Sequence, residues 1–302
     1  MANMTNPRIS FIIPTVNRCQ ELQNCIASIE RSYERVVNAD IEIVVVFQGL
    51  DAKKDVKIRF PQFSYFYHIE KKGLSLARNF GIRKSTGEYL VFLDDDTVIN
   101  EDFIKVLLRE IAATQASAFC CRDTDPLKRK FYSMRFSGIK VKLLNYFEYI
   151  YFVGYAHIIK RSSIERIGFY DEKFGIGAQY PAAEESDVFF KLMRLGERII
   201  YLSDLAVHHP VPATTPEFKR FNYAYATGAM LTKQMIFDAK HLPIYFLILC
   251  GIILKSFFRT LQTIFFPNNV RASDLIFRHK SVFTGTLKGI CAYIRMEGIP
   301  HL

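Results

Sequence analysis

The chain has 302 residues, of which 50% are hydrophobic and 23% are charged, and this composition excludes a disordered protein. Its length allows one sizeable core, or one core with a small appendage. The net charge is +10, and the stretch from Pro210 to Leu302 supplies most of it, with 11 Lys or Arg against 4 Asp or Glu. A basic surface favours phosphorylated ligands, anionic lipid or nucleic acid. Because no helix-turn-helix, zinc-finger or RNA-binding motif accompanies the charge, we expect no nucleic-acid partner.

Strand-like and helix-like segments alternate through the first third of the chain. Runs rich in apolar and aromatic residues predict strands over 9–13, 41–47, 63–69 and 89–93. Helical spacing predicts helices over 21–33, 74–84 and 100–113, the last capped by Asn100. The run Ile41 to Phe47 is almost entirely apolar, as expected for a strand covered on both faces. This alternation predicts an α/β fold with a mostly parallel, Rossmann-like sheet flanked by helices.

The rest of the chain is less regular. Residues 122–155 are basic and aromatic with weak periodicity, which predicts loops and short helices on one rim of the sheet, and a helix over 187–195 and a strand over 198–202 follow. The run from Leu242 to Leu254 is strongly apolar, but its 13 residues fall short of the roughly 20 that span a bilayer. A core helix and a helix lying in a membrane interface both fit this run.

Three consecutive carboxylates, Asp94, Asp95 and Asp96, follow the apolar strand 89–93. Such groups repel one another unless a cation lies among them, and ligands of open α/β sheets bind at the carboxyl ends of the strands. Mg²⁺ and Mn²⁺ prefer carboxylate oxygens and can bridge to phosphates. The triplet therefore predicts a divalent-metal site, with a solvated acidic turn as the alternative.

The order of motifs resembles glycosyltransferase family 2. The matching segments are ISFIIPT at 9–15, GLSLARNFGI at 73–82, LDDD at 93–96, IGFYDE at 167–172 and EESD at 184–187. The resemblance covers about residues 8 to 210. It implies a GT-A fold, a nucleotide-sugar donor and transfer with inversion. It also implies a glycosyltransferase domain over 1–212, with a nucleotide-sugar half (about 1–115) and an acceptor half (about 116–212), followed by a helical, basic and aromatic C-terminal region over 213–302.

The resemblance implies roles for the residues at the donor and metal sites. Asp94 and Asp96 match the family's DxD motif, and Asp96 is the better metal ligand. The third ligand is either His208 or His209, which follow the strand-like Leu-Ala-Val segment. The residues expected to bind the donor nucleotide are Pro14, Thr15, Gln48, Arg78, Asp94 and Asp95. Arg78 fits either the pyrophosphate or an exposed helical position, and Asn79 fits a cap or brace of its loop.

An inverting transfer also needs a base for the acceptor hydroxyl. Glu185 aligns with the family's usual base, but it is Glu where Asp is typical. Asp187 is therefore a second candidate and Glu184 a third. Alternatively, all three acids only favour the start of a helix.

The sequence departs from the family pattern after the strand 41–47, where Gln48 and Gly49 replace an acidic motif. The Gln48 amide can still bond a pyrimidine edge, since it has both a donor and an acceptor. We therefore expect a UDP-sugar donor by default, with a dTDP-sugar as the alternative.

Together these features predict an inverting glycosyltransferase that uses Mg²⁺ or Mn²⁺ and acts on a surface-polysaccharide or lipid-linked glycan acceptor. The alternatives are a non-catalytic membrane-surface scaffold on a degenerate GT-A fold and a sugar-phosphate nucleotidyltransferase. The latter is disfavoured because no glycine-rich phosphate loop follows the first strand. The six cysteines lack metal or CxxC spacing and the first ten residues lack an apolar signal region. We therefore expect a cytoplasmic protein, peripheral at an anionic membrane surface on the inner face of the cell membrane.

Overall fold

The computed structural model describes residues 8–49, 57, 59–125, 130–131, 140–210, 215–265 and 272–297. The chain forms two compact units. The first contains residues 1–170 and 191–211, and the second contains residues 171–190 and 212–302. The second unit therefore includes residues 171–190, which the sequence placed in the N-terminal domain.

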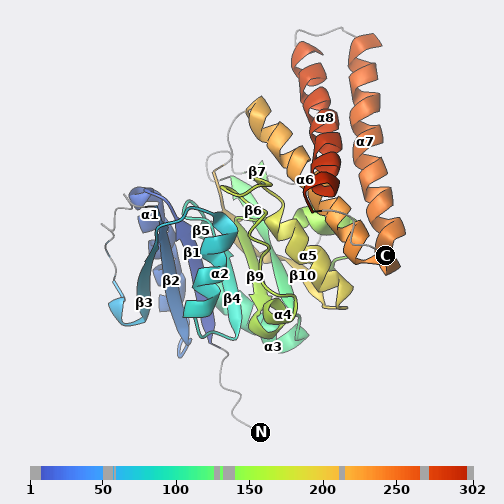
Figure 1. The fold of residues 1–302 in the computed structure, drawn as a ribbon. Coiled ribbons are helices and arrows are strands. Elements are labelled where there is room, and N and C mark those ends of the chain that lie inside the picture. The colour runs from blue at the N-terminus through green and yellow to red at the C-terminus, as the bar shows by residue number, and fades with distance from the viewer. Residues whose placement is uncertain are drawn as a thin grey trace. The chain divides into compact units, whose positions relative to one another are not determined.

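The first unit is built on one sheet of ten described strands in the order β3-β2-β1-β4-β9-β6-β10-β5, with β7 beside β6 and β8 beside β10 (Figure 1). The strands are β1 (Ile9–Thr15), β2 (Ile41–Gln48), β3 (Ser64–Ile69), β4 (Tyr89–Leu93), β5 (Val98–Ile99), β6 (Ala118–Asp125), β7 (Lys130–Phe131), β8 (Val141–Leu143), β9 (Ala156–Lys160) and β10 (Ile199–His208). Strands β3, β2, β1 and β4 are parallel, as are β6 and β10. Strand β9 is antiparallel to both β4 and β6.

Helices cover both faces of this sheet. Helix α1 (Cys19–Glu34) and helix α3 (Phe103–Thr114) pack on one face, where Phe11 and Ile13 of β1 belong to the same core as Leu22 and Phe103. Helix α2 (Leu74–Lys84) packs on the other face against β1 and β2. The described part of this unit also contains the short helices η1 (Pro61–Phe63), η3 (Tyr146–Tyr151) and α4 (Arg161–Arg166). This is the helix-flanked α/β architecture that the sequence predicted.

Most predicted elements of the first third are present, and β1 and β2 are buried along their whole length. The prediction of loops from residue 122 was wrong at its start, since β6 continues to Asp125. Its polar end is held in the sheet because Arg122 pairs with Ala206 and Asp123 with Val207 of β10. Strand β9 was also missed. The helix predicted from Asn100 begins at Phe103, after Asp102.

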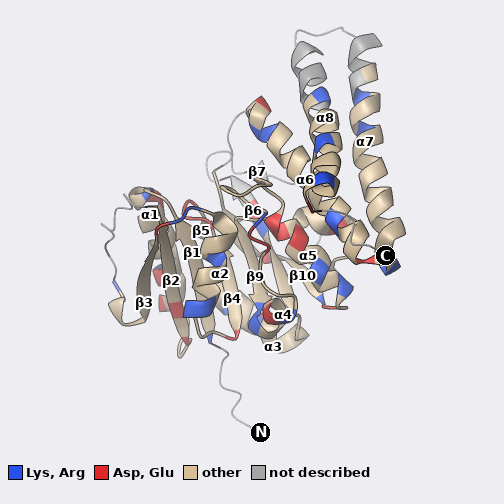
Figure 2. Ribbon diagram, in the orientation of Figure 1, with Lys and Arg blue, Asp and Glu red and all other residues tan. Residues whose placement is uncertain are grey.

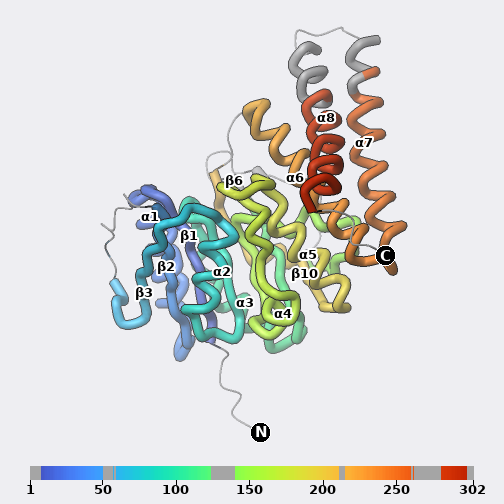
Figure 3. Tube along the Cα trace, in the orientation of Figure 1, coloured from blue at the N-terminus to red at the C-terminus, as the bar shows by residue number. Residues whose placement is uncertain are grey.

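The second unit is helical. It comprises the start of helix α5 (Glu184–Arg194), helix α6 (Glu217–Phe237), η4 (Ala239–His241), helix α7 (Leu242–Phe265) and helix α8 (Ala272–Glu297). Helices α6, α7 and α8 lie side by side (Figure 3). Helices α6 and α8 approach so closely that a Cβ atom on Gly289 would overlap the carbonyl oxygen of Tyr225. Glycine is required there because only a missing side chain allows this backbone contact.

Helix α7 is longer than the predicted 13-residue run, because it continues past Lys255 and Arg259. Tyr245, Ile248 and Leu249 on one face are buried. The other face exposes large apolar side chains, namely Leu242, Phe246, Leu247, Leu254, Phe257 and Phe258. By length and composition, 239–259 is the one stretch of the described residues that could cross a membrane.

Candidate functional site

The acidic triplet lies at the carboxyl end of β4, beside the carboxyl end of β1. Ile12 pairs with Phe92 in parallel register, so that three residues farther along Thr15 comes beside Asp95. The Thr15 hydroxyl donates a 2.7 Å hydrogen bond to Asp95 Oδ2, and both side chains are buried. The structure thus brings Thr15 and the acidic triplet together at one edge of the sheet, and Pro14 is buried in β1 beside Val46.

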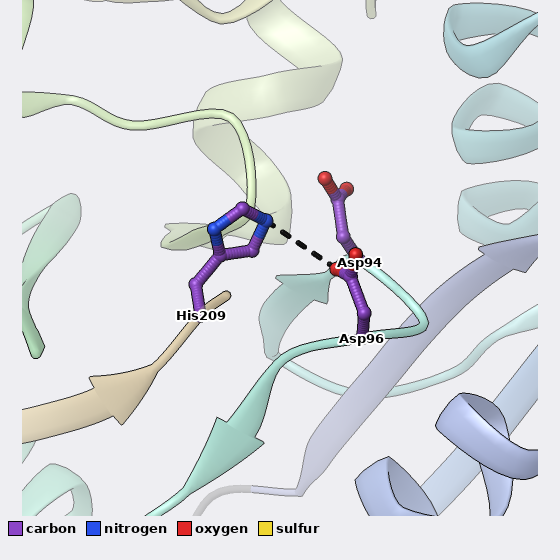
Figure 4. Close-up of side chains that lie close together, drawn as sticks. All are labelled: Asp94, Asp96 and His209. Carbon is purple, nitrogen blue, oxygen red and sulfur yellow. Dashed lines mark ion pairs between the residues drawn. The ribbon is translucent and has the colours of Figure 1, made fainter. Parts of the chain in front are cut away.

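A histidine reaches the same edge from β10. Strand β5 begins two residues after Asp96 and pairs antiparallel with the end of β10, with His208 opposite Val98. His209, the next residue, therefore lies beside the acidic turn, with its Nε2 3.3 Å from Asp96 Oδ1 (Figure 4). Asp94, Asp96 and His209 offer ligand atoms that all lie within 4.8 Å of one another. Of the two histidines that the sequence left open, the structure brings His209 to the carboxylates.

Arg18 is the main cation at this edge, and the sequence reasoning did not assign it a role. Its Nη1 donates hydrogen bonds to Asp95 Oδ1 at 3.2 Å and to Asp96 Oδ2 at 2.6 Å. The signal for it was its position in Pro-Thr-Val-Asn-Arg, directly after the first strand. Half of the Arg18 side chain is exposed, so the guanidinium is accessible to a ligand as well as bound to the acids.

These surroundings change the pKa values of the two acids in opposite directions. Burial raises the pKa of Asp95 to about 6, with a contribution from the neighbouring Asp96, although Thr15 and Arg18 oppose the shift. Burial also disfavours ionised Asp96, but the hydrogen bonds and charges of His209 and Arg18 hold its pKa below the ordinary value. Asp96 is therefore the acid held most firmly as a carboxylate, which suits a metal ligand.

Arg78 forms an ion pair with Asp94. Its guanidinium donates to Asp94 Oδ1 at 3.1 Å and to the carbonyl oxygen of Gly154 at 2.7 Å, and it lies over the ring of Tyr170. The side chain is fully buried, so the alternative of an exposed helical cation was wrong. Asn79 braces the same region as expected, since its amide exchanges two hydrogen bonds with the backbone of Tyr170.

Two further side chains complete this edge. The ring of Tyr155 stacks on His209 with centroids 4.2 Å apart, and its hydroxyl donates to Asp123 Oδ2 at 2.6 Å. Stacking and the Asp96 contact together orient the imidazole. Gln48, at the end of β2, accepts a hydrogen bond from Gly73 N–H through Oε1. The side-chain oxygen of Gln48 is thus already bonded within the protein.

The residues of this edge fit a divalent cation. Asp94 and Asp96 supply the hard oxygen atoms and His209 supplies an imidazole nitrogen, a set that suits Mn²⁺ and Mg²⁺. All three side chains are partly buried and partly accessible. A cation that binds here would retain open positions for other ligands.

The three candidate bases belong to the second unit, in the first turn of α5, which begins three residues earlier than predicted. Glu184 is buried and Glu185 is partly exposed. Asp187 is completely buried, and its Oδ1 accepts hydrogen bonds from Lys233 Nζ and Gln234 Nε2, both at 2.7 Å. The structure therefore distinguishes Glu185, which a substrate can reach, from Asp187, which the protein itself binds.

Comparison with known proteins identifies the family of this chain. The sequence model of glycosyl transferase family 2 matches residues 10–168. The glycosyltransferase GlyA of Streptococcus pneumoniae serotype 4 is 32% identical over 118 residues, covering 37% of this chain but only 16% of GlyA. The succinoglycan biosynthesis protein ExoM of Rhizobium meliloti is 24% identical over 217 residues, covering 68% of this chain and 67% of ExoM.

Solved structures share the fold. Residues 1–349 of S. aureus TarS superpose with a TM-score of 0.63 at 14% identity, covering 95% of this chain and 91% of that one. The mannosyltransferase PcManGT from Pyrobaculum calidifontis, solved with GDP-Man and Mn²⁺, gives a TM-score of 0.63 at 17% identity, covering 95% and 88%. These likenesses show the GT-A type fold. The chain therefore belongs to glycosyl transferase family 2 and is a glycosyltransferase, as its motifs predicted.

Proposed function

We propose that this chain is a metal-dependent, inverting glycosyltransferase that moves a sugar from a nucleotide-diphosphate sugar to a hydroxyl group of a surface-polysaccharide or lipid-linked glycan. The observation that carries the proposal is the cluster of Asp94, Asp96 and His209 at the carboxyl edge of a GT-A sheet. Ligands of such sheets bind at this edge. ExoM, whose name assigns it to succinoglycan biosynthesis, supports a polysaccharide acceptor.

On the donor side, Asp94, Asp96 and His209 would hold a Mg²⁺ or Mn²⁺ ion, which neutralises charge on the departing nucleoside diphosphate. Arg18 lies against the same carboxylates with half of its side chain exposed, and it offers N–H donors to phosphate oxygens. Thr15, Asp95 and the Gln48 amide line the adjoining strand ends, where the nucleotide is expected. Buried Arg78 holds the Asp94 carboxylate in place.

On the acceptor side, Glu185 is the base that takes the proton from the attacking hydroxyl. It is partly exposed, whereas Asp187 is enclosed and hydrogen-bonded within the protein. The Asp187 carboxylate already accepts hydrogen bonds from Lys233 and Gln234, so it is engaged within the protein and enclosed away from an acceptor hydroxyl.

A panel of donors tests this proposal. Purified protein with Mn²⁺ is titrated with UDP-, dTDP- and GDP-sugars, because a solved TarS complex contains UDP-GlcNAc and the PcManGT complex contains GDP-Man. We expect binding that depends on the metal, with a UDP-sugar as the first candidate. NMR of the transferred sugar reports whether the anomeric configuration is inverted. No metal-dependent binding of any donor would overturn the proposal.

We further propose that α7 holds the enzyme at the inner face of the cell membrane, near a lipid-linked acceptor. One face of α7 is apolar and exposed, and basic positions accompany this helix (Figure 2). Lys240 lies exposed just before α7, and Lys255 and Arg259 lie exposed within it, where they can meet anionic headgroups. We expect the protein to float with vesicles that contain anionic lipid.

The matched variants carry acids at exposed apolar positions. Replacing Phe257 and Phe258 by Glu is expected to abolish flotation, whereas the same change at Val37, which is 84% exposed in the first unit, is expected to preserve it. Unchanged flotation of the double variant would exclude α7 as the membrane contact.

A further inference from the structure

We propose that Lys233 of α6 is a positioning residue for Glu185, because it anchors the first turn of α5 and the segment that precedes it. Lys233 lies outside the segment matched by the family model and outside every motif found in the sequence. The inference rests on the proposed role of Glu185 as the base. It gives the C-terminal helices a part in catalysis.

Lys233 joins two acids from different parts of the second unit. Its Nζ lies 2.7 Å from Asp171 Oδ2 and 2.7 Å from Asp187 Oδ1. The Asp187 side chain is 0% exposed and the Lys233 side chain 12%. Gln234, the next residue of α6, adds a second hydrogen bond to Asp187. One turn of α6 thus holds both ends of the segment from Asp171 to Asp187.

The charges make this anchor strong. Burial disfavours the ammonium form, yet Asp187 and Asp171 keep the pKa of Lys233 above its ordinary value, so that the side chain is a cation at neutral pH. A buried carboxylate that loses such a partner carries a large desolvation cost. The first turn of α5 is therefore held most firmly with Lys233 in place.

Helix geometry explains how an anchor at Asp187 orients Glu185. Side chains two positions apart on a helix point in different directions. When Asp187 is fixed towards α6, Glu185 is turned to a side where it remains partly exposed. Ala183, immediately before α5, has a φ of 66°, a conformation that a non-glycine residue keeps only when its surroundings impose it.

The segment between the two acids is held by the same helices. Lys233 Nζ lies 5.2 Å from the ring centroid of Phe174, which stacks on Tyr180 at 4.8 Å. Tyr180 is fully buried beside Tyr225 of α6 and Tyr293 of α8. Phe174 and Tyr180 thus pack against α6 and α8, and the ion pairs of Lys233, together with that of Lys173 with Glu297 of α8, add polar contacts to this support.

The test compares Lys233→Met with wild type in the full chain. We expect kcat for transfer to fall about 100-fold, the scale for misplacing a reacting group by roughly 1 Å. Affinities for Mn²⁺ and donor should change less than about twofold, because their proposed residues belong to the first unit. Lys233→Arg, which keeps the positive charge, should recover part of kcat. Lys219→Met, at an exposed position of the same helix, is the matched control and should retain wild-type kcat.

A second variant keeps the test decisive if Lys233→Met unfolds. The double variant Lys233→Met with Asp187→Asn removes the uncompensated charge, so its melting temperature should return towards wild type while kcat stays low. Wild-type kcat in either folded variant would overturn the inference, as would an equal loss in Lys219→Met. If the wild-type protein transfers no sugar, or if the Glu185→Gln variant remains active, the proposed function itself is overturned, and this inference with it.

Discussion

The two units of this protein each contain a cluster of aspartates, and the clusters differ in how far the protein encloses them and their partners. At the edge of the sheet, Asp94, Asp95 and Asp96 face two arginines, and one of these, Arg18, is half exposed. In the helical unit, Asp171 and Asp187 share the nearly buried Lys233. Acids exceed bases by one in each set, but in the first set Asp94 and Asp96 are only partly buried. The second set is more deeply buried and its charges are bound within the protein.

The difference teaches that carboxylates become candidate sites through accessibility, more than through number or spacing. Asp96 and Asp187 both lie in acid-rich motifs. A cation can replace the contacts that Asp96 makes with Arg18 and His209. If Asp187 gave up its contact with Lys233 in the same way, the buried ammonium group would lose part of the negative charge that compensates it. The four predictions that follow test this contrast, from the largest expected effect to the smallest.

Asp96→Ala is expected to lower metal-dependent donor binding more than about 100-fold, because a direct ligand matters more than an outer-shell partner. Titration calorimetry with Mn²⁺ and the donor measures the loss. Asp204→Ala, at an exposed position of β10, is the control and should bind like wild type. Retained metal-dependent binding in Asp96→Ala would refute the site assignment.

The two histidines are expected to differ. His209→Ala should weaken Mn²⁺ binding about 10- to 100-fold, because it removes the imidazole that lies 3.3 Å from Asp96. His208→Ala should have much less effect, since His208 is the last residue of β10 and lies outside the ligand cluster. Manganese binding followed by electron paramagnetic resonance compares the two. Equal losses, or a larger loss in His208→Ala, would contradict the geometry.

Gly289→Ala should destabilise the helical unit by about 1–3 kcal/mol, because the new methyl group overpacks the contact between α6 and α8. Gly251→Ala on α7 is the matched control. No neighbouring atom lies within 4 Å of its added Cβ, so it should gain up to about 1 kcal/mol. Urea unfolding measures both changes. Manganese binding by folded Gly289→Ala should equal that of wild type, and a loss would show that the two clusters are not independent.

Glu42 is a third kind of acid, since its side chain is buried and its carboxylate is hydrogen-bonded within the protein. Its carboxylate accepts hydrogen bonds from the Ser10 and Thr86 hydroxyls and from the Thr86 and Gly87 N–H groups. Burial opposes ionisation, but these bonds and the charge of Arg8 hold the pKa of Glu42 below its ordinary value. Its ionised form therefore stabilises the fold above the unfolded-state pKa, and this contribution disappears as the pH falls through the folded-state pKa.

Glu42→Gln should accordingly lower the free energy of unfolding by about 1–3 kcal/mol at pH 7. The difference from wild type should shrink as the pH falls below about 4. Urea unfolding at several pH values measures it, with Mn²⁺ binding as the control that should stay unchanged. A difference that grows in acid would reverse the assigned direction of the pKa shift.

The sequence by itself determined the elements whose pattern is local. The apolar runs at 9–13, 41–47 and 89–93 became β1, β2 and β4, because nearly continuous apolar segments of this length fit strands that are covered on both faces. Thr15 and the acidic triplet were each assigned to the end of one of these strands, where ligands of open α/β sheets bind. The family motifs are also local, since each is a short run of neighbouring residues.

Tertiary structure decided what depends on residues far apart in the chain. Pairing of β5 with β10 brought His209 to Asp96, and no local feature separates His209 from His208. Packing of α6 enclosed Asp187 and left Glu185 partly exposed, although Lys233 lies 46 residues from Asp187. Exposure and ion pairing are set by such distant contacts, whereas strand and helix patterns are set by residues that are neighbours in the chain. For this reason the sequence identified the candidate acids, but only the fold distinguished them from one another.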